Sequence, residues 1–118
     1  MKKERKEIKA KTKKVIAVKS GGFCYKEGER LEKEETIIGE FAHIESDSPI
    51  GPRANPENPR DNTAKNLILV TNNNHKIIDE QVEKYPTADL QKIKKEHEEK
   101  IREKQFKAKE KLKNKSFF

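Results

Sequence analysis

The chain has 118 residues, of which 31% are hydrophobic and 42% charged, and it contains no Trp. This length allows one small domain with a modest core. No apolar run approaches the roughly 20 residues that cross a bilayer, and the Lys-rich N-terminus lacks the apolar segment of a secretory signal. We therefore expect a soluble, intracellular protein without a membrane partner. The single cysteine, Cys24, excludes an internal disulfide and a zinc site built from two or four cysteines.

The net charge of +7 is distributed unevenly along the chain. Residues 1–19 contain nine Lys or Arg and two Glu, and residues 90–118 contain eleven and five. Residues 20–89 contain eight basic and fourteen acidic residues. The basic ends suit a polyanion, because each cation that neutralises a phosphate releases condensed counterions, and the acidic centre suits a divalent cation. The alternative is that these lysines only solvate two exposed helices.

The first predicted element is a helix over residues 8–19, where the apolar residues recur with helical spacing and form one narrow stripe. Gly21 and Gly22 follow, and glycine favours the left-handed conformation that ends a helix. Residues 23–35 predict an irregular hairpin or loop with a turn at Gly28.

A short strand is predicted over residues 36–44, with a kink or bulge at Gly39. Residues 45–65 are rich in Pro, Asn and Asp and predict a long loop, which in so small a domain is usually functional or disordered. The most apolar run of the chain, residues 66–70, predicts a second strand.

Two helices complete the predicted order. The run TNNN at 71–74 offers N-cap residues for a helix over about residues 75–84, which Pro86 ends. Thr87 can begin a last, long helix whose apolar face comprises Leu90, Ile93, His97, Ile101, Ala108 and Leu112. This face thins beyond residue 102, which predicts fraying or a contact with a partner there.

Four polar residues stand at the ends of these predicted elements. His43 closes the first strand, Asn66 opens the second, and His75 and Asp79 lie one turn apart on the following helix. Residues four apart share a helical face, so an imidazole and a carboxylate there can bind one divalent ion. Each residue alone has an ordinary interpretation: His43 as a half-buried imidazole, His75 as a cap or exposed side chain, Asp79 as a solvated charge.

Taken together, the motifs resemble those of the HNH endonucleases, whose ββα-metal unit belongs to the His-Me finger superfamily. The resemblance rests on GEFAHI at 39–44, GPR at 51–53, NLILVTNNNHKIID at 66–79 and LQKIKKEHE at 90–98, and it covers about residues 8–100. It implies an α+β fold, with a ββα-metal core between an N-terminal helix and a long C-terminal helix. Residues 1–102 would form the nuclease domain, and residues 103–118 a basic helical tail that frays or leads to a partner domain.

The resemblance also implies roles for the four residues. His43 would be the general base that activates water, and Asn66 would fasten the long loop around it. His75 and Asp79 would hold one divalent ion, Mg²⁺ or Mn²⁺ before Zn²⁺ or Ni²⁺, during hydrolysis of DNA to 5′-phosphate and 3′-hydroxyl ends. Because the cysteine pairs of many relatives are absent, we predict no structural zinc.

One departure concerns the metal shell. Many HNH enzymes carry a ligand just before the catalytic histidine, where this chain has Ala42. Two expectations remain open: two protein ligands suffice, or a residue of the long loop such as Asp47 completes the shell.

The supporting residues are also expectations. Glu40 would pair with Arg53 to brace the site or contact phosphate. The DNA backbone would be contacted by basic residues that give affinity without sequence readout, namely Lys11, Lys13, Lys14, Arg53, Arg60 and Lys76.

The biological setting is expected from the same resemblance. Domains of this kind occur in bacterial or phage proteins of the cytoplasm, in restriction and in anti-phage defence, where a fused or associated sensor or specificity domain supplies selectivity. A homodimer is plausible, because one ββα site cuts one strand. Two alternatives remain: a non-catalytic DNA-binding relative that keeps the scaffold, and a helical protein-interaction module that uses residues 90–118.

Overall fold

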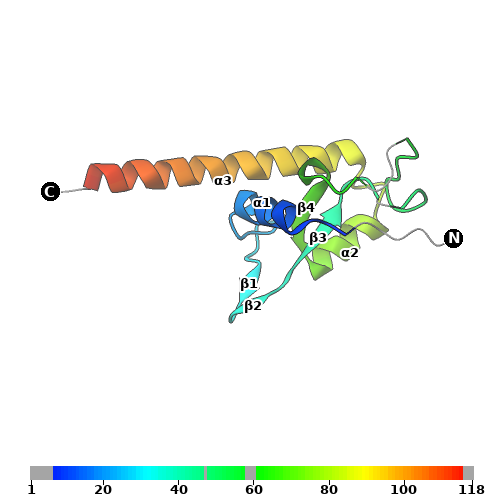
Figure 1. The fold of residues 1–118 in the computed structure, drawn as a ribbon, viewed down its shortest axis with the longest axis horizontal. Coiled ribbons are helices and arrows are strands. Elements are labelled where there is room, and N and C mark those ends of the chain that lie inside the picture. The colour runs from blue at the N-terminus through cyan, green and yellow to red at the C-terminus, as the bar shows by residue number, and fades with distance from the viewer. Residues whose placement is uncertain (1–6, 47, 58–60, 116–118) are drawn as a thin grey trace.

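The computed structural model describes residues 7–46, 48–57 and 61–115 and shows an α+β fold (Figure 1). A long C-terminal helix runs along one side of a small globular part that contains all other elements (Figure 1). In chain order these are α1 (Ala10–Ser20), β1 (Glu32–Lys33), β2 (Thr36–Ile37), β3 (Gly39–His43), the 3₁₀ turn η1 (Ala64–Asn66), β4 (Leu67–Thr71), α2 (Asn72–Glu80) and α3 (Thr87–Lys115). No helix in this described part combines the length and the apolar character that crossing a membrane requires.

Helix α1 ends where the sequence predicts. Gly21 adopts a left-handed conformation with φ of 65°, and its N–H donates to the carbonyl of Val18. A methyl group added at Gly21 would lie 2.8 Å from the side chain of Ile101 on α3. The absence of a side chain at Gly21 therefore lets the end of α1 approach α3 closely, while Ile16 is buried in the core.

The predicted strand over residues 36–44 is divided in the structure. Its first part, β2, pairs with β1 in a small hairpin whose turn residues, Glu34 and Glu35, have positive φ. The N–H of Ile38 then donates to the carbonyl of Leu31, so the chain leaves the hairpin before β3 begins at Gly39. The hairpin projects from the rest of the globular part (Figure 1).

Strands β3 and β4 form the central antiparallel pair, with Gly39 opposite Thr71 and His43 opposite Leu67. All five residues of β4 are buried, as expected for the most apolar run of the chain. On β3, Ala42 is buried, and Ile44 just beyond it is also fully buried, so this face of the strand packs into the core.

Helix α2 begins and ends earlier than the predicted helix over about residues 75–84. Its N-cap is Thr71, whose hydroxyl oxygen accepts a hydrogen bond from the N–H of Asn74 at 3.2 Å. The helix ends at Glu80, and residues 82–84 form turns that lead to α3. The TNNN run thus contains the cap, at its first residue, and its three asparagines form the first turn.

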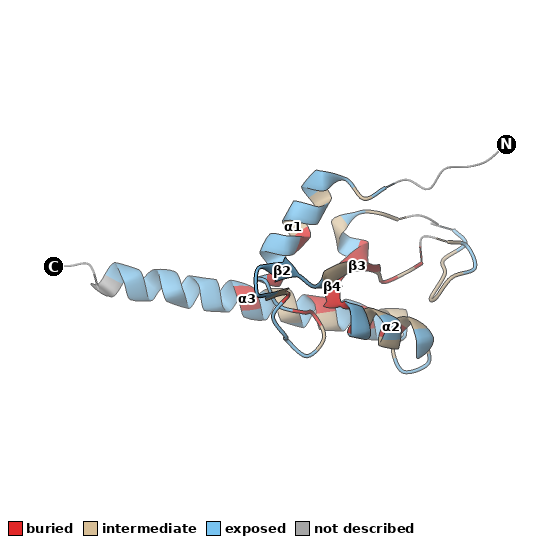
Figure 2. Cartoon of the chain, turned by 90° about the horizontal axis from the view of Figure 1, so that it is seen from below, coloured by how far each residue is buried: buried red, intermediate tan, exposed pale blue. Residues whose placement is uncertain are grey.

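Helix α3 continues without interruption to Lys115, so the structure shows no fraying at residue 102. Ile101 is the last buried residue among residues 87–113 of the helix, and every residue from 102 to 113 is exposed (Figure 2). The second half of α3 therefore projects from the globular part, and the longest extent of the molecule is 66 Å against 31 and 30 Å in the other directions.

Candidate active site

The long loop between β3 and β4 is held at both ends by Asn66. This residue is 5% exposed. Its Nδ2 donates to the carbonyls of Glu45 at 2.9 Å and Asp61 at 2.8 Å, and its Oδ1 accepts from the N–H of Glu45 at 2.9 Å. One amide therefore joins the first residues of the loop to its last ones. This is the fastening that the sequence analysis expected of Asn66; a part in catalysis stays a prediction.

His43 is the last residue of β3 and lies half-buried at the start of this loop. Its Nε2 is 2.6 Å from Oδ1 of Asn62, which lies near the other end of the loop. Because an amide oxygen only accepts, this arrangement places a proton on Nε2 and leaves Nδ1 as the basic nitrogen. The ring is thus held by a side chain, not by the backbone carbonyl that would be the usual partner.

Asn62, the partner of His43, is not among the candidate residues predicted from the sequence. The loop contains several asparagines, and the neighbouring residue types do not distinguish Asn62 from Asn55. The only available signal is its place four residues before Asn66, close to where the loop must return to β3.

His75 and Asp79 lie on one face of α2, as their spacing predicts. Nε2 of His75 is 3.2 Å from Oδ2 of Asp79, and Nδ1 of His75 is 2.8 Å from Oε1 of Glu40 on β3. The imidazole therefore lies between two carboxylates, one from its own helix and one from the neighbouring strand.

This arrangement shifts the ionisation of all three groups. The hydrogen bond with Asp79, and then that with Glu40, raise the pKa of His75 above its ordinary value although partial burial opposes them. The hydrogen bond from His75, supported by Asn72, lowers the pKa of Glu40. Burial alone would raise the pKa of Asp79, but hydrogen bonds from His75 and Arg53 outweigh burial and lower it. In the absence of a metal ion the cluster therefore favours an imidazolium between two carboxylates.

The position of the Arg53 side chain contradicts two predictions, a pair with Glu40 and a contact with DNA. Its side chain is 2% exposed, and Nη2 donates to Oδ1 of Asp79 at 2.6 Å, so it does not pair with Glu40. Its other N–H groups donate to the carbonyls of Ile44, Ile78, Tyr85 and His43. A guanidinium whose donors are used in this way inside the protein is not free to contact DNA phosphates. Arg53 instead ties the end of β3, the loop and the end of α2 together.

Glu40 has partners other than the predicted one. Its two carboxylate oxygens accept from His75 Nδ1 and from Asn72 Nδ2, the latter at 2.6 Å. Asn72 is the first residue of α2, so Glu40 joins β3 to the start of the helix that carries His75.

The donor atoms of His75 and Asp79 suit one divalent ion. Two ligands in adjacent positions of an octahedral ion lie about 3 Å apart when each is about 2.1 Å from the metal, and Nε2 of His75 and Oδ2 of Asp79 are separated by 3.2 Å. Glu40 binds the other ring nitrogen and is placed to orient the imidazole, as second partners of ligating histidines commonly do.

A third side-chain ligand is absent from the described residues, in which no group of three or more His, Cys, Asp or Glu could hold a metal. Ala42 is fully buried in the core, and its methyl side chain cannot bind a metal ion. Asp47, the candidate from the loop, lies outside the described residues.

Apart from Arg53, the residues predicted to contact DNA are either exposed lysines or lie outside the described residues. Lys11, Lys13 and Lys14 on α1 and Lys76 on α2 are exposed, although Lys76 lies 3.9 Å from Glu80. Arg60 lies outside the described residues.

The only cysteine is part of a hydrogen-bonded junction. The sulfur of the buried Cys24 accepts from the N–H of Thr71 at 3.4 Å and from Nδ2 of Asn74 at 3.3 Å. Nδ2 of Asn74 also lies within hydrogen-bonding distance of Lys26 O and Glu29 Oε1. Polar contacts therefore connect the turn after α1 to the start of α2.

No protein-family model matches the chain, and no curated protein is significantly similar to it.

Proposed function

We propose that the chain is a metal-dependent endonuclease of the HNH type that hydrolyses DNA phosphodiester bonds. The observation that carries this proposal is the connection of four motif residues in one cluster. Glu40 binds His75, His75 binds Asp79, and Asp79 binds Arg53, whose guanidinium also lies 3.4 Å from the carbonyl of His43. The order β3, loop, β4, α2 around this cluster is that of the ββα-metal unit.

His43 is the proposed general base. Asn62 holds Nε2, so Nδ1 is left to accept a proton from water as it attacks the phosphorus. Asn66 keeps the loop, and with it Asn62, in place beside the end of β3. Arg53 acts as a positioning residue, because it binds the backbone of His43 and the carboxylate of Asp79 at the same time.

His75 and Asp79 are the proposed ligands of one divalent ion, Mg²⁺ or Mn²⁺ in the first place. When bound, such an ion polarises the phosphate and stabilises the leaving oxygen. Binding requires His75 to lose the proton that its two carboxylate neighbours favour, so protons and metal compete for this residue.

The exposed lysines of α1 and α2 are the proposed contacts to the DNA backbone. Such contacts give affinity without reading sequence, so we expect low specificity from this domain alone. Selectivity would then come from a second copy or from a fused or associated sensor or specificity domain, as in restriction and anti-phage proteins.

The proposal is tested by incubating supercoiled plasmid with the purified protein and Mg²⁺ or Mn²⁺. We expect nicking that EDTA abolishes and that His43→Ala and Asp79→Asn reduce by about a hundredfold or more. Gln91→Ala, an exposed change on α3, serves as the control that keeps activity. If His43→Ala nicks as fast as the unchanged protein, the assignment of the base is wrong. If the protein binds plasmid but cuts it with neither metal, it is the non-catalytic relative. The reason would be the missing third metal ligand at the position of Ala42.

A further inference from the structure

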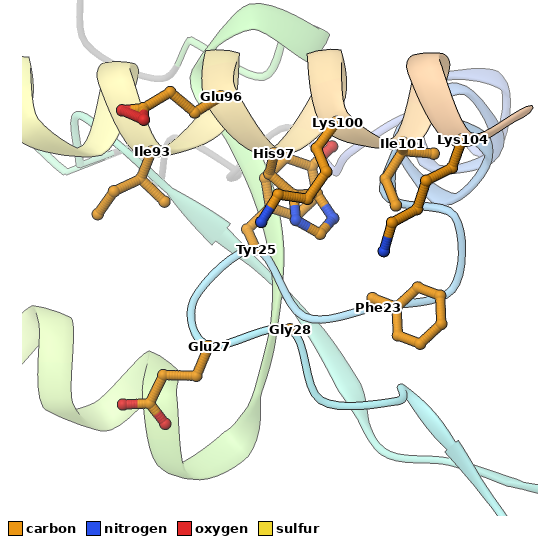
Figure 3. A pocket seen from close by; sticks show the side chains of 10 residues that line it. All are labelled: Phe23, Tyr25, Glu27, Gly28, Ile93, Glu96, His97, Lys100, Ile101 and Lys104. Atoms are coloured by element: carbon orange, nitrogen blue, oxygen red, sulfur yellow. The ribbon is translucent and has the colours of Figure 1, made fainter. Parts of the chain in front are cut away.

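An open pocket of about 470 Å³ lies between α3 and the loop that follows α1 (Figure 3). None of the residues that line it belongs to the proposed nuclease site. Its chemistry is a combination of aromatic side chains from the loop and lysines from the helix, which the nuclease proposal does not use.

The inner wall of the pocket is aromatic and rigid. Tyr25 is 4% exposed, its ring centroid is 4.6 Å from that of His97, and its hydroxyl donates to Glu98 at 2.7 Å. Nε2 of His97 donates to the carbonyl of Ser20 at 2.9 Å. Both rings are therefore fixed by partners inside the protein. Phe23 lies at the edge of the pocket and is 37% exposed, which leaves part of its ring open to a ligand.

Two cations cover this aromatic wall. The side chains of Lys100 and Lys104 extend from α3 toward the loop, with Phe23 below Lys104 (Figure 3). Both lysines are exposed, and within the described chain neither forms an ion pair. The carboxylates at the border, Glu27 and Glu96, point away from these ammonium groups (Figure 3).

The two lysines begin a longer basic row on the same face of α3. Lys100, Lys104, Lys107 and Lys111 follow one another at steps of four, three and four residues, and all four are exposed. This spacing keeps them on one side of the helix over about 16 Å. The row leads from the pocket along the projecting half of α3.

The geometry points to a binding site for single-stranded nucleic acid, in which one base enters the pocket and stacks on Phe23 while the adjoining phosphates follow the row of lysines. Aromatic side chains beside a basic track are the combination that binds single strands, because every base has a face that stacks. The volume lies within the range of roughly 300–1,000 Å³ that small-molecule-sized groups occupy. A duplex does not fit this description, because its bases are already stacked and paired.

This inference goes beyond the proposed nuclease function and does not require it. Binding is therefore measured by fluorescence anisotropy in EDTA, where metal-dependent cleavage does not occur. The probes are labelled oligonucleotides of twelve nucleotides: oligo(dT), oligo(U) and a DNA duplex of the same length. The DNA and RNA strands share the chemistry that the pocket recognises, and comparing them shows which sugar the site prefers.

We expect Phe23→Ala to weaken binding of the single strands by about tenfold and binding of the duplex by less than about twofold. Phe23→Leu keeps apolar volume but has no ring and should lose nearly as much. Lys100→Gln with Lys104→Gln should also weaken single-strand binding, and by more than the matched pair Lys92→Gln with Lys109→Gln, which removes two charges of α3 outside the pocket.

Thermal unfolding of each variant identifies those that fold as the unchanged protein does, and only these are compared. The inference is overturned if Phe23→Ala binds both single strands as tightly as the unchanged protein. It is also overturned if the two lysine pairs have equal effects, since the binding would then depend on total charge and not on the pocket. Loss of plasmid nicking alone would bear on the nuclease proposal and leave this one standing.

Discussion

The guanidinium of Arg53 lies within hydrogen-bonding distance of four backbone carbonyls. Its side chain is buried, its φ is 54°, and it binds carbonyls near the ends of β3 and α2, the carbonyl of Tyr85 and the carboxylate of Asp79. A positive φ is uncommon for a residue with a side chain. The hydrogen bonds of its guanidinium hold the residue in this conformation, because they join it to four carbonyls and one carboxylate.

We predict that Arg53→Lys lowers the free energy of unfolding by about 2–4 kcal/mol, because an ammonium group cannot reproduce the planar fork of donors and a buried pair is disrupted. Urea denaturation measures this effect. Arg102→Lys, an exposed position on α3, should cost less than about 0.5 kcal/mol. Equal costs at the two positions would contradict the role given to Arg53.

A second buried ion pair makes the stability of the fold depend on pH. Nζ of Lys94 is 2.7 Å from Glu98, and both side chains are 11% exposed. Burial alone would raise the pKa of Glu98, but hydrogen bonds from Lys94 and Tyr25 outweigh it and hold the pKa below its ordinary value. A carboxyl whose pKa is lowered by folding contributes stability above its unfolded pKa, and that stability is lost as the pH falls through the folded value.

Glu98→Gln should therefore destabilise the protein clearly at pH 7 and progressively less below about pH 4.5. Thermal unfolding of the two proteins across this range gives the comparison. Glu110→Gln, on the exposed part of α3, is the control and should follow the unchanged protein at every pH. A difference between Glu98→Gln and the unchanged protein that stays constant from pH 7 to pH 3 would show that the carboxylate charge is not what stabilises the fold.

At the scale of elements, the contact of α1 with α3 depends on a glycine. Gly21 and Gly22 both have positive φ, but only at Gly21 would an added methyl group meet another residue, Ile101 at 2.8 Å. We predict that Gly21→Ala costs about 1–3 kcal/mol more than Gly22→Ala, because both introduce backbone strain and only the first forces α3 away.

Ile101→Ala provides the test of this explanation. In that background Gly21→Ala should cost no more than Gly22→Ala, since the group it strikes has been removed. Persistence of the extra cost would mean that the strain at Gly21 comes from the backbone and not from packing against α3. Chemical denaturation gives the cost in free energy of unfolding of Gly21→Ala and of Gly22→Ala, each measured in the unchanged protein and in the Ile101→Ala background.

Some features of these elements can be predicted from the sequence, and others cannot. The end of α1 at Gly21, the buried strand β4 and the capping of α2 within the TNNN run follow from local rules, and the structure agrees with them. The partners of Glu40 and Arg53 do not follow from local rules. Glu40 is 35 residues from His75 and Arg53 is 26 from Asp79, and which pair meets depends on how the loop returns to the sheet.

The candidate site likewise contains one contact that the sequence predicts and one that it does not. The pairing of His75 with Asp79 is predictable because the helix itself brings residues four apart together. The contact of His43 with Asn62 is not, because it depends on where Asn66 fastens the loop, and the sequence offers several equivalent asparagines. Contacts within one element were therefore accessible from the sequence, whereas contacts across the loop required the structure.

At the scale of the whole molecule, the projecting half of α3 is separable from the fold. No residue from 102 to 113 is buried, and the residues of α3 that pack in or against the core, Leu90, Ile93 and Ile101, all precede this stretch. Deleting residues 105–118 should therefore change the free energy of unfolding by less than about 1 kcal/mol. It removes five lysines, at positions 107, 109, 111, 113 and 115.

The deletion should nevertheless alter binding to DNA. If the tail binds the backbone, the slope of log affinity against log salt concentration becomes less steep by about 0.9 for each duplex phosphate that the shortened protein no longer neutralises, and by about 0.7 for a single strand. A full-length variant with the five lysines changed to glutamine keeps the helix and should show the same reduced slope. If that variant binds like the unchanged protein while the deletion does not, the tail acts through its apolar residues, Phe106 and Leu112, as a protein-interaction helix would. An unchanged slope in both would place every DNA contact on residues 1–104, which include the exposed lysines of α1 and the two lysines of the pocket, Lys100 and Lys104.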